Sequence, residues 1–503
     1  MSVCQESLPG RLQKEKNEQA FPKARESLRP ADYSDVGNAA VFSRVFRNDL
    51  AYTDALGWLW WNGHRWERDD HKALVWAMRF SDRMLQEASA ANQAVMVKEM
   101  EIRMEAAKKG EEVDGSIRRT LEREQKDAVK FLRHAQNLRG ARQLKNMMEL
   151  SAASLVVKAE TLDANPFDLN TPAGIVNLAT GELRPHERKA WCSRITSASP
   201  GEEGNEVWLD FLESVTCGDR SVQGFLQMVA GMALIGAVYQ EGIVIAYGEG
   251  SNGKSTFFNA LSEILGDYAG SIDVRTLTTD RSNKGVSLAT LRGKRLVVTG
   301  ELEEHQRLSA ATLKQLGSTD RLNIEEKFKQ PESVKQTHTL VLFTNHLPRV
   351  GSTDAGTWRR LTVIPFRATF SRQESVQNYG EILAQQAGSA ILSWAIQGSE
   401  NFIRNGFKLD IPDVVEEATE EYRQREDWLN NFIDERCIRD VGSRIGARNL
   451  YTEYKSWALD LGDYVRREND FSAAMLSAGF KKVKINGKPT YYGLRLDCPF
   501  PQS

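Results

Sequence analysis

The sequence predicts an α/β protein built around a parallel sheet, with a mixed α+β region before it and a small mixed module after it. Short apolar runs alternate with helical stretches over about 205–370, which is typical of a parallel sheet covered by helices. Residues 56–66 carry four tryptophans around Asn62-Gly63, a strong hairpin signal. Residues 72–155 are charged, contain few Gly or Pro, and space their apolar residues as helices do. The tryptophans favour a hydrophobic core, and base stacking is the less favoured alternative.

Composition excludes several classes of protein. The 503 residues include 66 Lys and Arg against 68 Asp and Glu, so nucleic-acid binding would need a local basic surface. The five cysteines are odd in number and form no CxxC pair, which disfavours a disulfide framework or zinc site and fits a reducing compartment. No apolar run approaches the roughly 18 residues of a membrane span, so we expect no membrane contact and a cytoplasmic location.

Changes in composition divide the chain into five stretches. Residues 1–35 have few apolar anchors, which predicts a mobile tail. We expect residues 36–204 to form the mixed α+β domain and 205–370 the parallel sheet with its helices. Residues 371–425 are expected to be a helical lid or linker, and 426–503 a small mixed module.

A glycine-rich loop follows the apolar strand predicted at 242–247. It consists of Gly248, Glu249, Gly250, Ser251, Asn252, Gly253, Lys254, Ser255 and Thr256. The sequence matches G-x-x-x-x-G-K-[ST], in which glycines let backbone N–H groups surround phosphate oxygens and the next helix points its positive dipole end at them. We expect Lys254 to reach the β- and γ-phosphates and Ser255 to hold Mg²⁺. The loop therefore predicts a nucleoside triphosphate site.

Hydrolysis also needs a carboxylate for the metal or water, a group that positions water, and a cation for the transition state. Glu301 directly follows one predicted strand and is the expected carboxylate, with Glu303 as a second acid. Asn345 follows another strand and could hydrogen-bond the γ-phosphate or the attacking water. Arg359 and Arg360 precede a further strand and could act across a subunit boundary. The plain alternatives are a solvated acidic loop, a turn-forming amide and surface arginines.

These motifs resemble a known family. Over about 240–367 the chain resembles the superfamily 3 helicases of the AAA+ class, and among them the phage/plasmid and poxvirus-type primase-helicase family. The matches are Walker A at 248–255, Walker B at 297–301, the sensor at 343–345 and the arginine-finger segment at 357–366. Weaker resemblance extends to the preceding domain at 61–66 and 174–183, and to a C-terminal winged-helix module at 449–457.

The resemblance implies an ATP- and Mg²⁺-dependent DNA helicase. Such proteins form a hexameric ring, hydrolyse ATP at subunit interfaces and move 3′→5′ on one strand during replication of a phage, plasmid or other mobile element, here in a bacterial host cell. The implied partners are single-stranded and forked DNA, further copies of the chain and a separate primase or other replication protein. The N-terminal domain would form a collar or recruit partners.

Two departures from the family pattern bear on this expectation. Glu301 is followed by Leu302, where the family pattern has adjacent acids, so the second acid stays open. No polymerising domain is visible, so we expect a helicase without primase activity.

Two basic segments are expected to contact DNA. In related helicases a hairpin between Walker B and the sensor carries a lysine and a ring-bearing residue, and Lys327, Phe328 and Lys329 fall there. A helix at 471–479 precedes a hairpin around Asn486-Gly487, an arrangement of helix and wing suited to duplex phosphates. Its lysines are Lys481, Lys482, Lys484 and Lys488. A solvated charged loop and a protein-contact module are the respective alternatives.

Two other functions remain open. The first is a DNA-binding initiator or loader that uses ATP as a switch and does not unwind. The second is an AAA+ machine that remodels protein, which single-stranded DNA would not stimulate.

Overall fold

The computed structural model describes residues 27–278, 288–300, 307–324, 332–350, 354–371, 376–462 and 464–497. The described residues form two compact units. The first ends at Val176 and also contains Leu183–Ile195. The second contains Asn177–Glu182 and what is described from Thr196 onward.

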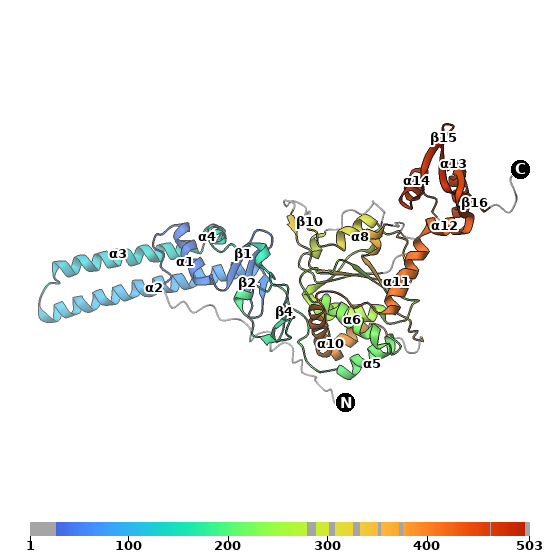
Figure 1. Ribbon diagram of the computed structural model, residues 1–503. Helices are drawn as coiled ribbons and strands as arrows, with labels where there is room; N and C mark the ends of the chain where they lie inside the picture. The colour runs from blue at the N-terminus through green and yellow to red at the C-terminus, as the bar shows by residue number, and fades with distance from the viewer. Residues whose placement is uncertain are drawn as a thin grey trace, which may run out of the picture. The chain divides into compact units, whose positions relative to one another are not determined.

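The first unit combines small antiparallel sheets with helices (Figure 1). Strands β1 (Leu50–Thr53), β2 (Gly57–Trp61) and β3 (Trp66–Arg68) form one sheet, and β4 (Asp168–Thr171), β5 (Gly174–Asn177) and β6 (Leu183–Arg184) form another. The hairpin predicted at Asn62-Gly63 is confirmed, since β2 pairs antiparallel with β3 across it. Trp58, Trp61 and Trp66 are buried, which confirms the core interpretation of these aromatics.

The helices of this unit include a long antiparallel pair. They are α1 (Asp35–Phe46), α2 (Asp70–Lys109), α3 (Gly115–Leu138) and α4 (Ala141–Ser154). Asp69 caps the start of α2 by accepting from Lys72 N–H, and Gly110 ends the helix at a φ of 66°. Leu28 is buried in the same core, although it lies in the stretch predicted as a tail. Residues 1–26 lie outside the described residues, and for them the tail stays a prediction.

The second unit is built on a five-stranded parallel sheet, as predicted. The spatial order is β13 (Leu361–Pro365), β7 (Ile243–Tyr247), β12 (Thr339–Thr344), β9 (Leu296–Thr299) and β8 (Ala269–Ser271). Every neighbouring pair is parallel. The strands are continuous apolar runs because both faces are covered by helices.

Helices lie on both sides of this sheet (Figure 1). Helix α7 (Lys254–Leu265) packs against α10 (Tyr379–Arg404), which also contacts α5 (Asn205–Val215) and α6 (Arg220–Met232). On the other face, residues of α8 (Ala310–Leu316), α9 (Ala355–Trp358) and α11 (Asp413–Glu426) join the core around Ile243 and Ile245. A strand order that places later strands on both sides of β7 opens a ligand site at the carboxyl end of β7.

The C-terminal module has a core of its own, formed by residues such as Trp428, Phe432 and Tyr454. Its elements are α12 (Trp428–Arg436), β14 (Cys437–Gly446), α13 (Ala447–Asp460), α14 (Glu468–Ser477), β15 (Lys482–Ile485) and β16 (Lys488–Leu496). The predicted helix followed by a hairpin is confirmed: Asn486 and Gly487 turn the chain at φ values of 45° and 77°. Its membership of the winged-helix class stays a prediction.

Candidate nucleotide-binding site

The glycine-rich loop joins β7 to α7 at the carboxyl edge of the parallel sheet. Gly250, Ser251 and Gly253 have φ values of 27°, 50° and 83°, a left-handed path that glycine adopts readily. A Cβ atom on Gly248 would lie 2.4 Å from the carbonyl oxygen of Phe366, so no side chain fits there without a backbone shift. The loop therefore has the tight turn that its sequence predicts.

Lys254 is the first residue of α7 and only 3% exposed. Its Nζ donates to the carbonyl oxygen of Gly248 at 3.1 Å, to Asn252 Oδ1 at 3.4 Å and to Asn345 Oδ1 at 2.5 Å. These three uncharged oxygens hold the ammonium in place at the start of α7. A fixed positive charge at a helix N-terminus is suited to phosphate.

Asn345 links the end of β12 to the phosphate loop that follows β7. It follows β12, which lies beside β7, and its Oδ1 accepts from the N–H of Gly250 at 3.3 Å as well as from Lys254. The structure thus brings the predicted polar group of one strand to the loop of its neighbour. Strand β9 ends at the same edge, but Glu301 and Glu303 lie outside the described residues, so the expected carboxylate stays a prediction.

Arg359 and Arg360 lie at the opposite edge of the sheet. They precede β13, which runs parallel to β7 with Leu361 opposite Ile243. Five residues of strand, about 15 Å, separate that edge from the loop. Both arginines pair with Glu241, Arg360 Nη2 at 2.6 Å and Arg359 Nη2 at 3.4 Å. The side chain of Arg360 is 11% exposed, whereas that of Arg359 is 66% exposed. Neither arginine contacts the phosphate loop of its own chain.

The residue types at the loop fit Mg²⁺ with a triphosphate. Ser255, half-buried in the first turn of α7, would supply a hydroxyl beside Lys254. No group of three or more His, Cys, Asp or Glu side chains gathers within the described parts of the chain. Mg²⁺ at nucleotide sites usually takes one or two carboxylates and otherwise phosphate and water, so a protein cage is not needed.

The structure describes only part of the two basic segments that are predicted to contact DNA. Strands β10 (Leu322–Ile324) and β11 (Glu332–Val334) pair antiparallel, which confirms the base of the hairpin predicted between Walker B and the sensor. The tip, with Lys327, Phe328 and Lys329, lies outside the described residues. On the C-terminal hairpin all four predicted lysines are exposed: Lys481, Lys482, Lys484 and Lys488. Lys482 also donates to Ser472 Oγ at 2.6 Å within its own module.

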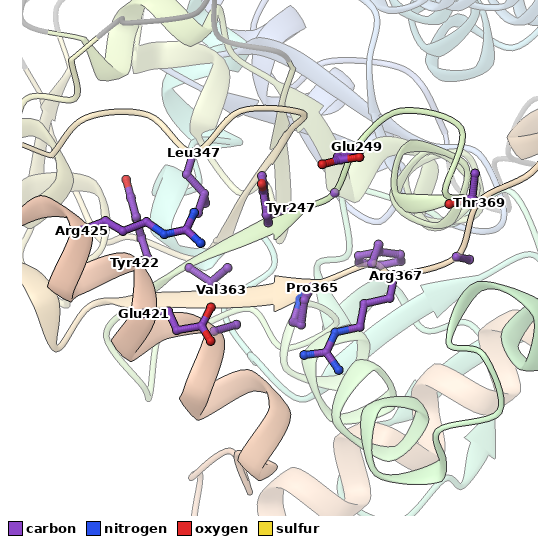
Figure 2. A pocket seen from close by; sticks show the side chains of 14 residues that line it. Tyr247, Glu249, Leu347, Val363, Pro365, Arg367, Thr369, Glu421, Tyr422 and Arg425 are labelled. Carbon is purple, nitrogen blue, oxygen red and sulfur yellow. The ribbon is translucent and has the colours of Figure 1, made fainter. Parts of the chain in front are cut away.

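Sequence reasoning missed a cavity beside the loop. It has a volume of about 310 Å³ and is lined by the ends of β7 and β13, by Leu347 and by α11 (Figure 2). Helix α11 was predicted only as part of a linker. No local signal marks this cavity, because its walls come from four separate segments of the chain.

Two family models match the chain. The model described as "D5 N terminal like" matches residues 39–217, and "Family of unknown function (DUF5906)" matches residues 246–360. The chain is 25% identical over 364 residues to the putative helicase L207/L206 of Acanthamoeba polyphaga mimivirus, covering 65% of this chain and 38% of that protein. It is 22% identical over 325 residues to the putative primase C962R of African swine fever virus, covering 59% and 34%.

The chain is related to the D5-type primase-helicases. The resemblance predicted from the motifs is therefore confirmed. A further relative, the putative helicase 022R of Frog virus 3, is 24% identical over 298 residues, which cover 54% of this chain and 30% of that protein. The chain thus spans about a third of the length of the curated relatives it matches.

Solved structures are similar to this chain as well. The apo structure of the NrS-1 C-terminal region is 16% identical and covers 59% of this chain and 76% of that one. Its TM-score of 0.35 is too low to support a functional conclusion. Among the described residues no helix is both long and apolar enough to cross a membrane.

Proposed function

We propose that this chain is an ATP-dependent DNA helicase that acts in replication as a ring, with six copies and 3′→5′ movement. The observation that carries the proposal is the contact of Lys254 and Asn345 at the mouth of the phosphate loop. A cation at the start of α7 and an amide that follows β12 converge where the γ-phosphate would lie. The names of the relatives, putative helicase and putative primase, support a replicative role.

The residues have separate tasks in ATP hydrolysis. The loop N–H groups and the dipole of α7 would hold the phosphates, and Lys254 would stabilise the charge that develops on the transferred group. The amide of Asn345 would orient the attacking water or sense the γ-phosphate. Mg²⁺, when bound with ATP, supplies further positive charge, and Ser255 would be its protein ligand together with the expected Glu301.

The position of Arg359 and Arg360 supports a nucleotide site that is shared between neighbouring copies of the chain. Because Arg359 and Arg360 lie about 15 Å from the loop of their own chain, an arginine finger would have to act on the nucleotide of a neighbouring subunit. Both arginines pair with Glu241, Arg360 at 2.6 Å and Arg359 at 3.4 Å, and the side chain of Arg359 is 66% exposed against 11% for Arg360, so Arg359 is the better candidate. Closed rings place the same surface of every copy against the next one.

DNA contact would come from two basic segments. The hairpin on β10 and β11 would place Lys327 and Phe328 where an ammonium meets phosphate and a ring meets a sugar or base. The exposed lysines of the hairpin between β15 and β16 would bind duplex phosphates. Repetition around a ring would let a chain of net charge −2 hold DNA.

Strand separation of a forked DNA with 3′ or 5′ tails tests the proposal, with ATP hydrolysis measured in parallel and mass photometry reporting the number of copies. We expect Lys254→Ala to abolish DNA-stimulated ATP hydrolysis and unwinding, and Lys408→Ala, an exposed lysine on another segment, to preserve both. Undiminished hydrolysis in Lys254→Ala would contradict the motor assignment. ATP hydrolysis by the wild-type protein without any strand separation would favour the initiator or loader.

A further inference from the structure

A groove lies between α10 and the start of α5 in the second unit. Figure 1 shows the two helices side by side, and the groove has a volume of about 1000 Å³. Helix α10 contributes a stripe from Ala390 to Glu400, which is about 15 Å of helix. The groove shares no residue with the phosphate loop or with the cavity beside it, so the proposed nucleotide site does not account for it.

Hydrogen bonds and a close backbone contact fix the walls of this groove. The N–H of Gly201 donates to Ser393 Oγ at 2.8 Å, and the same hydroxyl donates to the carbonyl oxygen of Gly201 at 2.9 Å. A Cβ atom on Gly204 would lie 2.4 Å from the Cα atom of Ala387, so the chain that enters α5 packs directly on the backbone of α10. The groove is therefore a preformed feature of the second unit.

The groove combines apolar surface with acidic side chains. Val207 and Leu209 are 36% and 43% exposed, and the half-buried Trp394 packs edge-on against Trp208 with ring centroids 5.1 Å apart. Every charged residue that the structure places in the lining is a glutamate: Glu202, Glu206 and Glu400. Within the described parts of the chain, none of these carboxylates has a hydrogen-bond or ion-pair partner.

The unpaired carboxylates restrict the partners that this groove can take. They would repel the phosphates of nucleic acids and of anionic lipids. An apolar floor between carboxylates is complementary to a protein surface with an apolar centre and cations around it. The C-terminal module of this chain carries such a surface.

That surface is the outer face of the hairpin formed by β15 and β16. Tyr491, opposite Lys482, is fully buried in the core of the module, so strand alternation points Val483 and Tyr492 to the other side. The exposed fractions of Val483 and Tyr492 are 51% and 39%. The cations of this outer face are all exposed: Lys481, Lys488 and, opposite Tyr492 on β14, Arg444.

We infer that the groove between α5 and α10 receives the outer face of the C-terminal hairpin of a second copy of this chain. Tyr492 and Val483 would pack over Trp394, and the cations would pair with the glutamates. Because the groove and the hairpin face are different surfaces, the contact is head-to-tail, the kind that can close a ring. Lys482 and Lys484 lie on the opposite face of the hairpin, so the contact leaves them for DNA. The inference rests on the proposed ring and names the surfaces that join its copies.

Charge reversal and rescue in the full-length chain test this contact. The groove variant is Glu206→Lys/Glu400→Lys, and the hairpin variant is Lys481→Glu/Lys488→Glu. A third variant combines all four changes and keeps the net charge of the wild type. Mass photometry over a range of protein concentrations measures assembly with ATP and Mg²⁺, in the absence and in the presence of forked DNA, and urea denaturation reports whether each variant is folded.

Matched controls make the same changes of charge outside the proposed contact. Glu416→Lys/Glu417→Lys alters two exposed acids on α11, and Lys482→Glu/Lys484→Glu alters the opposite face of the same hairpin. Tyr492→Ser removes apolar surface from the outer face without changing the charge. Because its side chain is partly exposed, this variant tests the contact even if a charge reversal prevents folding.

We expect each reversal variant to need at least about tenfold more protein for half-maximal assembly, because like charges would then face each other across the contact. The combined variant should return to within about threefold of the wild type, since its charge pairs re-form with exchanged signs. Tyr492→Ser should weaken assembly at least about threefold through lost apolar burial. Both controls should assemble as the wild type does in the absence of DNA.

Two results would count against the contact while leaving the proposed ring in place. One is wild-type assembly of the groove variant, the hairpin variant or Tyr492→Ser. The other is a folded combined variant that assembles no better than the reversal variants, which would show that the groove and the hairpin do not face each other. A wild type that stays monomeric with ATP, with and without forked DNA, would overturn the proposed ring as well.

Discussion

Replacing Asn345 by aspartate separates the two roles that the structure gives this side chain. The amide oxygen accepts from Lys254 Nζ and from the N–H of Gly250. Aspartate has the same shape and keeps both acceptors, but it adds a negative charge beside the phosphates. Two like charges 4 Å apart repel by about 4 kcal/mol at an effective dielectric of 20. With partial compensation by Lys254, we expect a loss of about 2–4 kcal/mol in ATP binding, or roughly 30- to 700-fold in Kd.

The stability of the protein without nucleotide should distinguish two replacements of Asn345. Asn345→Ala removes one hydrogen bond to a charged donor and one to a neutral donor, so the free energy of unfolding without nucleotide should fall by about 2–4 kcal/mol. Asn345→Asp should show no such fall, because the buried ammonium keeps its partner. Urea denaturation and ATP titration measure the two quantities. Asn401→Asp is the control, since its Oδ1 also accepts from a cation, Arg404, near the end of α10. Wild-type ATP affinity in Asn345→Asp would refute the placement of this residue beside the phosphates.

Three further predictions concern other parts of the second unit. Arg360→Ala should lower the free energy of unfolding by about 2 kcal/mol, because its side chain is 11% exposed and pairs with Glu241 at 2.6 Å. Arg359 pairs with the same carboxylate at 3.4 Å, but its side chain is 66% exposed, so Arg359→Ala should change stability by less than about 0.5 kcal/mol and lower only ATP hydrolysis by the assembled protein. If Arg360→Ala and Arg359→Ala had equal effects on urea denaturation and on ATP hydrolysis, this assignment of separate roles would be contradicted. Gly248→Ala should weaken ATP binding at least about tenfold, since its Cβ would lie 2.4 Å from the carbonyl oxygen of Phe366, and calorimetry that finds wild-type affinity would show that the loop tolerates a side chain. Burial lowers the pKa of His338 to about 4 from the usual 6.5, so the unfolded chain binds the proton first and stability is lost as pH falls from about 6.5 to 4. Relative to His338→Gln, the wild type should lose about 3 kcal/mol across that interval in urea denaturation, and parallel curves would contradict the assignment.

Local sequence was enough where neighbouring residues decide the outcome. The phosphate loop follows from glycines at positions whose φ is positive, and the hairpins at Asn62-Gly63 and Asn486-Gly487 follow from the same backbone freedom. Continuous apolar strands alternating with helices were enough to predict the parallel sheet. The position of Asn345 after such a strand placed it at the carboxyl edge, where the loop also lies.

Only the tertiary structure decided how distant segments meet. The strand order sets β12 beside β7, which brings Asn345 to Lys254. The same packing buries the side chain of Arg360 and leaves that of Arg359 exposed, although both pair with Glu241, and two adjacent arginines do not reveal this difference in sequence. Helix α11, far along the chain, closes the cavity beside the loop. A turn depends on the conformational preferences of a few consecutive residues, whereas these contacts depend on strand order and on which helix face the core buries.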